Sequence, residues 1–299
     1  MKKTVGIIGA GAWGTALAVV AARGGNPVLL WCSDEKKPKE INQRHWNPSL
    51  NGVSISREII ATSDMADLKR ADIWLIATPT EFFSKTVQKS RPFWQKQPII
   101  ICSKGIEPQT GRFLSDVVAD IIPGAGRMIG VLSGPQFAAE VAAGKPTGST
   151  VAGSRKVFDS ARCALPSFIL EESNDVYGVQ ICGAGKNVVA MLMGYLDAQG
   201  AGENERALKL TLAWQEIISF SRLFRAKMDT FGKLCGIGDL FLSATSKTSR
   251  NYSAGVAMAT GKKVTGTVEG IAALKWIIST AKKNKLHLPV LEKVSKVFN

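Results

Sequence analysis

The most constraining feature of this 299-residue chain is a glycine-rich stretch near its start, Thr4–Leu17 (TVGIIGAGAWGTAL). An apolar run over Val5–Ile8 leads into glycines and then into small, helix-favouring residues, which predicts a strand, a tight turn and a helix. Gly9, Gly11 and Gly14 have the G-x-G-x-x-G spacing of dinucleotide-binding turns. The first glycine allows the turn, the second lets a pyrophosphate approach the backbone, and the third lets helix and strand pack closely. The alternative is an ordinary glycine turn in a strand–helix unit.

Short apolar runs recur through the first half of the chain, separated by segments with helical or polar character. The expected later strands are Pro27–Cys32, Ile59–Thr62, Ile73–Ala77, Ile99–Cys102, Met128–Leu132, Thr150–Gly153 and Phe168–Glu172. Strands that alternate with helices form a parallel, doubly wound α/β sheet of the Rossmann type. Ligands of such sheets bind at the carboxyl ends of the strands. We therefore expect Gly9–Gly14, Thr78–Thr80 and Ser103–Gly105 to border one crevice.

The pattern changes at about Val179, where strand-like runs stop and long helical stretches begin. The expected helices are Val179–Leu196, Glu205–Lys227, Ser253–Thr260 and Val268–Lys283, with a glycine-rich joint at Gly232–Gly238. The sequence therefore predicts a dinucleotide-binding domain over residues 1–178 and an all-α substrate domain over residues 179–299. A helical second domain is compatible with a homodimer.

Charge is the unusual part of the composition. The chain has 38 Lys and Arg against 24 Asp and Glu, a net charge of +14. Such a surplus attracts phosphorylated metabolites or nucleic acid over long distances, although solvated surface lysines account for it equally well. No basic stripe is interleaved with aromatic residues, so nucleic acid is the less favoured partner.

Cysteine usage and hydropathy indicate the cellular compartment of the protein. The five cysteines are scattered, odd in number and without a C-x-x-C pair, which favours thiols in a reducing compartment and argues against metal or disulfide use. No run reaches the ~18 apolar residues of a membrane span. These features predict a cytoplasmic protein.

Few residues are suitable as a catalytic base. An enzyme that oxidises an alcohol needs a group to accept the hydroxyl proton, but the two histidines, His45 and His287, lie in a polar basic segment and near the C-terminus. Lys186 lies among small residues in a predicted helix start (CGAGKNVVA). A nearby cation such as Lys104 would lower its pKa and make it a usable base. Residue type alone favours an ordinary surface lysine.

Two further groups are candidates for ligand contacts. Asp34 follows the second predicted strand about 20 residues after Gly14, where an acidic group can bond the ribose hydroxyls; a turn aspartate is the equal alternative. Asp239 precedes a polar segment in which Ser249, Arg250 and Asn251 provide a hydroxyl, a guanidinium and an amide. This set can bind a phosphate group. The alternative is a polar loop with a helix cap.

Several ordered blocks together resemble the bacterial-type NAD(P)-dependent glycerol-3-phosphate dehydrogenases. They are GAGAWGTALA (9–18), VLLW (28–31), SKGIE (103–107), LSGPQFAAEVAAGKPT (132–147), GVQICGAGKNVVA (178–190), GIGDLFLSATSKTSRN (236–251) and VEG (268–270). The resemblance implies reversible hydride transfer between NAD(P)H and dihydroxyacetone phosphate, which forms sn-glycerol 3-phosphate for phospholipid synthesis.

The resemblance also assigns roles position by position. Lys186 would handle the hydroxyl proton, and Lys104 would contact both cofactor and substrate. The implied substrate-binding set is Lys104, Gly134, Lys186, Asp239, Ser249, Arg250 and Asn251. The expected cofactor-binding set is Gly9, Gly11, Ala12, Trp13, Gly14, Asp34, Lys104, Ala138, Arg250 and Glu269, and no metal is implied.

Three departures from the family pattern qualify these roles. Ser33 replaces a basic residue, which weakens a pocket for a 2′-phosphate and favours NAD slightly over NADP, although Arg44 and nearby lysines could compensate. Gln136 replaces a serine or threonine, and Gly185 replaces a bulky apolar residue. The alternatives are therefore a weakly active or non-catalytic nucleotide-binding relative, or a reductase of another small acid or phosphate.

Overall fold

A computed structural model describes residues 2–264 and 268–298 of the chain. The chain forms two compact units. Unit 1 comprises Met1–Ser103, Arg112–Leu132 and Gln136–Val176, and unit 2 comprises Lys104–Gly111, Ser133–Pro135 and Tyr177–Asn299. Unit 2 thus includes two short segments from the first half of the chain. A single boundary at residue 178 would place both segments in the first domain. The functional division of the chain at that residue stays a prediction.

Unit 1 is built on an eight-stranded sheet with the order β3-β2-β1-β4-β5-β6-β7-β8. The strands are β1 (Val5–Ile8), β2 (Val28–Trp31), β3 (Ile59–Thr62), β4 (Ile73–Ile76), β5 (Ile99–Ile101), β6 (Ile129–Ser133), β7 (Gly148–Ala152) and β8 (Ile169–Ser173). β1 pairs in parallel with both β2 and β4, with Val5 opposite Val28 and Ile73. The strand order reverses between β1 and β4, the point at which doubly wound sheets bind their ligands. The predicted fold class is confirmed.

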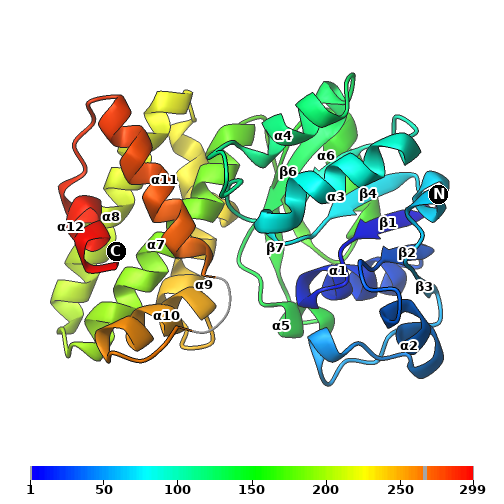
Figure 1. Cartoon of the computed structure of the whole chain (residues 1–299), viewed down its shortest axis with the longest axis horizontal. Helices are drawn as coiled ribbons and strands as arrows, with labels where there is room; N and C mark the ends of the chain where they lie inside the picture. Colours follow the sequence, from blue (N-terminus) through cyan, green and yellow to red (C-terminus); the bar gives the residue numbers. More distant parts are fainter. Residues whose placement is uncertain (1, 265–267, 299) are drawn as a thin grey trace. The chain divides into compact units, whose positions relative to one another are not determined.

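Helices cover both faces of this sheet. They are α1 (Ala12–Arg23), α2 (Lys37–Arg44), α3 (Phe83–Ser90), α4 (Leu114–Ile121), α5 (Ala138–Ala142) and α6 (Arg155–Ala164), all labelled in Figure 1. Successive strand residues point to opposite faces. Ile7 and Leu75 accordingly share one buried cluster with Leu17 of α1 and Ala161 of α6.

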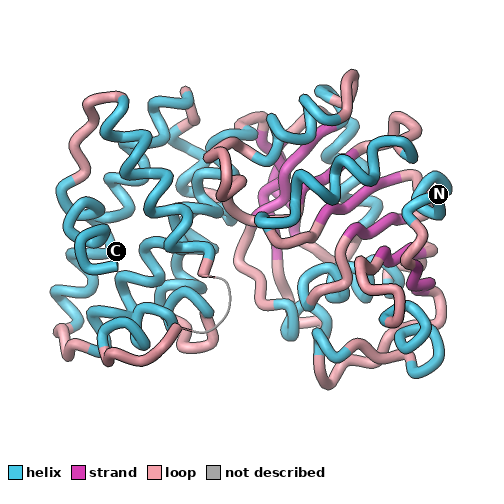
Figure 2. The backbone as a smooth tube through the Cα atoms, in the orientation of Figure 1, coloured by secondary structure: helices cyan, strands magenta, loops and turns pink. Residues whose placement is uncertain are grey.

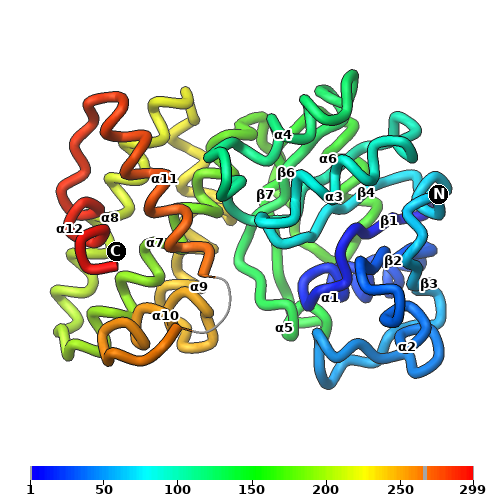
Figure 3. The backbone as a smooth tube through the Cα atoms, viewed as in Figure 1, coloured from blue at the N-terminus to red at the C-terminus, as the bar shows by residue number. Residues whose placement is uncertain are grey.

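The described part of residues 177–299 in unit 2 consists of helices and the loops between them. Its helices are α7 (Val176–Ala198), α8 (Glu203–Ser221), α9 (Asp239–Thr245), α10 (Arg250–Ala259), α11 (Glu269–Lys283) and α12 (Pro289–Phe298). Over the described part of residues 177–299, Figure 2 shows helices and loops but no strand. Figure 3 follows the chain from α7 to the red C-terminal α12, which packs against α8 and α11.

α7 is buried along most of its length, and small residues allow its neighbours to approach closely. A Cβ atom on Gly194 would lie 1.9 Å from the carbonyl oxygen of Tyr252, and one on Gly255 would lie 2.0 Å from that of Met191. The α7 and α10 backbones therefore touch where glycine is required. Among the described residues, α7 is long and apolar enough to cross a bilayer, but 89% of its apolar window is buried within the protein. Such burial is typical of a core helix.

Candidate active site

The glycine turn of unit 1 has the geometry that its spacing predicts. Gly9 has φ +117°, and a Cβ atom there would lie 2.8 Å from the carbonyl oxygen of Ala77, so only glycine fits this turn without strain. A Cβ atom on Gly14 would lie 1.8 Å from the carbonyl oxygen of Gly9, which explains the close approach of α1 to β1. By contrast, nothing lies within 4 Å of a Cβ atom built on Gly11. The turn is open at the position where a pyrophosphate would approach.

The N-terminus of α1 is suited to an anion. Gly11 is its N-cap, no side chain caps the helix, and its first turn contains no acidic residue. The first backbone N–H groups and the positive end of the helix dipole are thus available to a phosphate. Ala12 and Trp13 begin the first turn, and the Trp13 indole donates a hydrogen bond of 3.1 Å to the carbonyl oxygen of Cys102. These residues fit the pyrophosphate of a dinucleotide.

The other expected elements of the unit 1 site follow the carboxyl ends of the strands, at the same edge of the sheet. Ser103 donates to the carbonyl oxygen of Thr78 at 2.6 Å, and Thr78 lies beside the glycine turn. Asp34 is exposed, and its Oδ1 accepts from the backbone N–H of Lys36 at 2.9 Å, the geometry of a turn aspartate. Ala138 is the first residue of α5.

Unit 2 contains a largely buried group that we call the lysine–aspartate cluster: Lys104, Gly134, Lys186, Asp239 and Ser243. Lys104 Nζ lies 2.5 Å from Asp239 Oδ2 and 2.7 Å from the carbonyl oxygen of Gly134. Lys186 Nζ lies 3.1 Å from Asp239 Oδ1 and donates to Ser243 Oγ at 2.8 Å. The two lysines therefore converge on one carboxylate, and the alternative of a surface position for Lys186 is wrong.

Local structure explains how these side chains meet. Lys186 lies in the middle of α7 rather than at the helix start that its small neighbours suggested. Asp239 is the first residue of α9 and directly follows a π-helical turn, Leu234–Gly238, within the stretch predicted as a glycine-rich joint. Such turns occur often at functional sites. Ser243 lies one helical turn after Asp239, so both side chains share the same buried face of α9.

Burial and charge shift the pKa values of this cluster in opposing ways. Burial lowers the pKa of Lys186 below its ordinary value and Lys104 lowers it further, while Asp239 opposes both effects. Burial would raise the pKa of Asp239, but attraction to Lys104 and Lys186 outweighs it and leaves that pKa below its ordinary value. The arrangement holds an ionised carboxylate beside an amine that loses its proton more readily than a free lysine.

One of the departures from the family pattern, Gly185, has a structural explanation. A Cβ atom on Gly185 would lie 2.6 Å from Ile217 Cγ2, so the glycine compensates for a bulky α8 residue. Gln136 donates to Ser149 Oγ and, at 3.2 Å, to the carbonyl oxygen of Gly148. Its Oε1 atom is buried and has no hydrogen-bond partner.

A second polar group adjoins Lys186 along α7. Asn187 donates to Glu269 Oε2 at 3.1 Å, and its Oδ1 accepts from Asn251 at 2.8 Å. Asn251 in turn accepts from the backbone N–H of Gly270 at 3.0 Å. These bonds connect α7, α10 and α11, and they bring Asn251 and Glu269 to the same side chain, Asn187.

The remaining residues of the expected phosphate set differ in exposure. Ser249 is buried and is the N-cap of α10, accepting from the backbone N–H of Tyr252 at 3.4 Å. Arg250 follows it with a side chain that is 77% exposed and 3.9 Å from Glu269. The helix-cap alternative therefore describes Ser249, whereas the Arg250 guanidinium is accessible to an anion.

Sequence reasoning missed Ser243 and Asn187. The available signal was spacing: Ser243 is four residues after Asp239, and Asn187 is adjacent to Lys186. Neither position stands out by residue type, because buried serines and asparagines are common hydrogen-bonding residues in cores.

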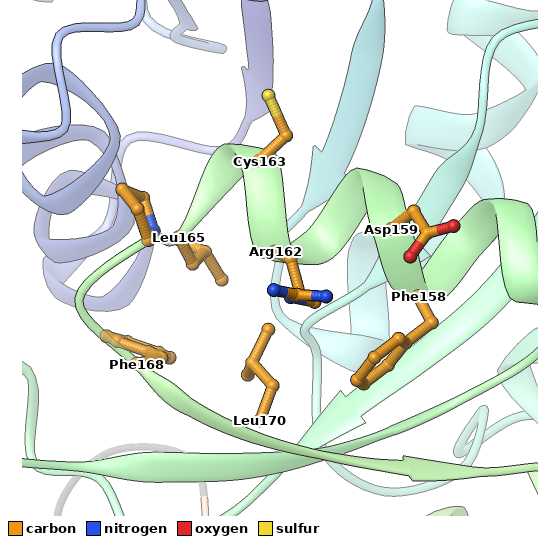
Figure 4. A pocket seen from close by; sticks show the side chains of 8 residues that line it. Phe158, Asp159, Arg162, Cys163, Leu165, Phe168 and Leu170 are labelled. Carbon is orange, nitrogen blue, oxygen red and sulfur yellow. The ribbon is translucent and has the colours of Figure 1, made fainter.

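Unit 1 also has a surface hollow of about 650 Å³ that contains none of these residues. Figure 4 shows Phe158 and Arg162 on α6 and Leu170 on β8 around it. Its remaining lining residues are Asp159, Cys163, Leu165, Pro166 and Phe168. Across residues 2–264 and 268–298, no group of three or more His, Cys, Asp or Glu side chains could hold a metal ion.

Comparisons with known proteins cover nearly the whole chain. Residues 4–159 match the family model of the NAD-dependent glycerol-3-phosphate dehydrogenase N-terminus, and residues 175–299 match that of its C-terminus. A glycerol-3-phosphate dehydrogenase [NAD(P)+] of Erythrobacter litoralis is 36% identical, over 100% of this chain and 92% of the relative. The crystal structure of glycerol-3-phosphate dehydrogenase from Coxiella burnetii has a TM-score of 0.91 at 30% identity, covering 100% of this chain and 95% of that one.

A more distant match shows the fold alone. A ketopantoate reductase from Ralstonia eutropha has a TM-score of 0.67 at 15% identity, covering 99% of this chain and 97% of that one. The substrate class is therefore better judged from the nearer relatives and from the site.

Proposed function

This chain belongs to the NAD-dependent glycerol-3-phosphate dehydrogenase family, and from this premise we propose that it transfers a hydride between NAD(P)H and dihydroxyacetone phosphate. The product is sn-glycerol 3-phosphate, a precursor for phospholipid synthesis. The observation that carries the proposal is the convergence of Lys104 and Lys186 on the buried carboxylate of Asp239. In this proposal unit 1 binds the dinucleotide and unit 2 holds the substrate.

Lys186 is the proposed proton donor and acceptor. When bound, the reduced dinucleotide supplies the hydride that the carbonyl carbon of the substrate receives. Lys186 Nζ gives a proton to the carbonyl oxygen, and in the reverse direction the neutral amine accepts it from the hydroxyl. Burial lowers the pKa of Lys186, which brings the proton transfer closer to the operating pH. Asp239 and Ser243 hold the amine in place through their hydrogen bonds.

Lys104 and the polar residues of α10 would bind the rest of the substrate. Lys104 contacts the carbonyl oxygen of Gly134 as well as Asp239, so its charge lies beside the proton-transfer group. The Arg250 guanidinium matches the geometry of phosphate oxygens. Ser249 and Asn251, at the start of the same helix, would contribute further hydrogen bonds to the substrate.

The direct test measures oxidation of NADH and of NADPH by purified protein with dihydroxyacetone phosphate. We expect the reduced-nicotinamide absorbance to fall with this substrate and to change little with unphosphorylated dihydroxyacetone. Protein that binds the dinucleotides by calorimetry but oxidises neither would instead be a non-catalytic relative. Activity on a hydroxyacid or on ketopantoate but not on the phosphate ester would identify another reductase.

Arg250→Ala is expected to raise the KM for dihydroxyacetone phosphate by about tenfold or more, because it removes a charge-assisted contact to phosphate. Its side chain is largely exposed, so the melting temperature should change little. Steady-state kinetics at constant ionic strength measures the effect, with Arg222→Ala as a control in the same unit. A fall in kcat at unchanged KM would contradict a role in phosphate binding.

Two broader expectations accompany the proposal. We propose that the protein acts in the cytoplasm and forms a homodimer. Light scattering coupled to size exclusion tests the assembly, and fractionation of cells that express the tagged full chain tests the location.

A further inference from the structure

A lysine ammonium group is fixed against the glycine turn of unit 1. Lys37 Nζ donates to the carbonyl oxygen of Ala10 at 2.9 Å and to Ser49 Oγ at 2.8 Å. Asn47 donates to the same Ala10 oxygen at 3.1 Å and to Thr15 Oγ1 at 2.7 Å. The segment after β2 thus folds back onto the turn, where one of its two anchoring side chains is charged and the other is neutral.

The location of this ammonium group corresponds to the adenosine end of a dinucleotide site. Ala10 follows β1 and lies between the first two glycines of the turn, and Lys37 begins α2, the first helix after β2. In doubly wound sheets, the ribose next to the adenine lies at the carboxyl end of the second strand, where a nearby cation accommodates a 2′-phosphate. Ser33 provides no cation there.

Lys37 is better placed for this role than Arg44. Arg44 is 69% exposed and is paired with Glu40 at 3.3 Å. The competing acidic group, Asp34, accepts from the backbone N–H of Lys36. Lys37 has three N–H donors, and the two hydrogen bonds above use two of them.

We propose, on the basis of the proposed dehydrogenase function, that Lys37 recognises the 2′-phosphate of NADP(H) and gives this chain a preference for the phosphorylated dinucleotide. The ammonium group compensates for the missing cation at Ser33. The absence of that cation was the reason that the sequence alone favoured NAD. Asn47 positions the turn for either dinucleotide.

The test is calorimetric binding of NADPH and NADH to the apo full-length protein, without substrate. The wild type should bind NADPH more tightly than NADH, and increasing salt should reduce the difference. Lys37→Met, which keeps the length of the side chain, should weaken NADPH binding by about tenfold and NADH binding much less. Lys37→Arg should retain the preference. Lys39→Met changes an exposed lysine of the same helix and should behave as the wild type.

Several outcomes would overturn the proposal. The first is that Lys37→Met weakens the binding of NADPH and NADH equally, which would show that Lys37 only holds the turn in place. The second is that Lys37→Met leaves the NADPH affinity unchanged. The third is that the wild type binds NADPH no more tightly than NADH at low salt. If a variant fails to fold, the comparison of NADPH and NADH affinities in the wild type still tests the proposed preference. The binding experiment contains no substrate, so its result can be interpreted whether or not the protein is active. A lack of turnover of dihydroxyacetone phosphate would refute the proposed function alone.

Discussion

Lys186→Met is expected to lower kcat by about 10²- to 10⁴-fold in both directions, the contribution of a positioned general acid or base. Methionine keeps the length of the side chain but cannot transfer a proton. Because the glycine turn belongs to the other unit, dinucleotide affinity should remain close to that of the wild type. Steady-state kinetics together with calorimetric NADH and NADPH binding measures both quantities.

The pH profile separates proton transfer from a structural role for Lys186. Oxidation of sn-glycerol 3-phosphate by the wild type should rise with pH, because the neutral amine accepts the proton. The midpoint should lie below the ordinary lysine pKa of 10.5, because burial lowers the pKa of Lys186. Lys186→Arg keeps the charge but does not deprotonate, so it should also be inactive. Lys275→Met, an exposed change on α11, is the control. A retained pH-dependent limb in Lys186→Met would contradict the assignment.

Asp239→Asn is expected to have the largest effect on stability. The substitution leaves the two lysines of the cluster without their shared counter-charge, and breaking a buried ion pair costs about 3–5 kcal/mol. Asp239 itself is 1% exposed, and the Lys186 side chain is 10% exposed. Urea unfolding at neutral pH measures the loss. Asp120→Asn is a matched control, because its partner Arg112 is a surface residue and exposed pairs contribute at most about 1 kcal/mol.

The same variant gives a second, independent measurement. Asp239 raises the pKa of Lys186 against the effects of burial and Lys104, so its loss should lower that pKa further. The alkaline limb of residual sn-glycerol 3-phosphate oxidation should therefore move to lower pH. The stability that Asp239 provides should also be lost in the wild type as pH falls through its lowered carboxyl pKa, because protonation removes the charge. Unchanged stability and an unchanged pH profile together would contradict a shared counter-charge.

The local architecture of this protein could be predicted from its sequence. The strands and the glycine turn depend on residues that are close together in the chain, and the predicted bounds of β3, Ile59–Thr62, agree with the structure. The change to helices near Val179 follows from a similar local pattern. The family resemblance also singled out Lys104, Lys186 and Asp239, although their roles stay proposals.

What only the tertiary structure decided is how distant residues meet. Lys104 and Asp239 are 135 positions apart, and no local pattern states that one carboxylate lies between two lysines or that Ser243 accepts from Lys186. The anchoring of Lys37 on the carbonyl oxygen of Ala10 likewise depends on how the segment after β2 folds back. Turns and strands follow from backbone preferences of neighbouring residues, whereas burial, pKa shifts and charge pairing depend on packing between segments that are far apart in sequence.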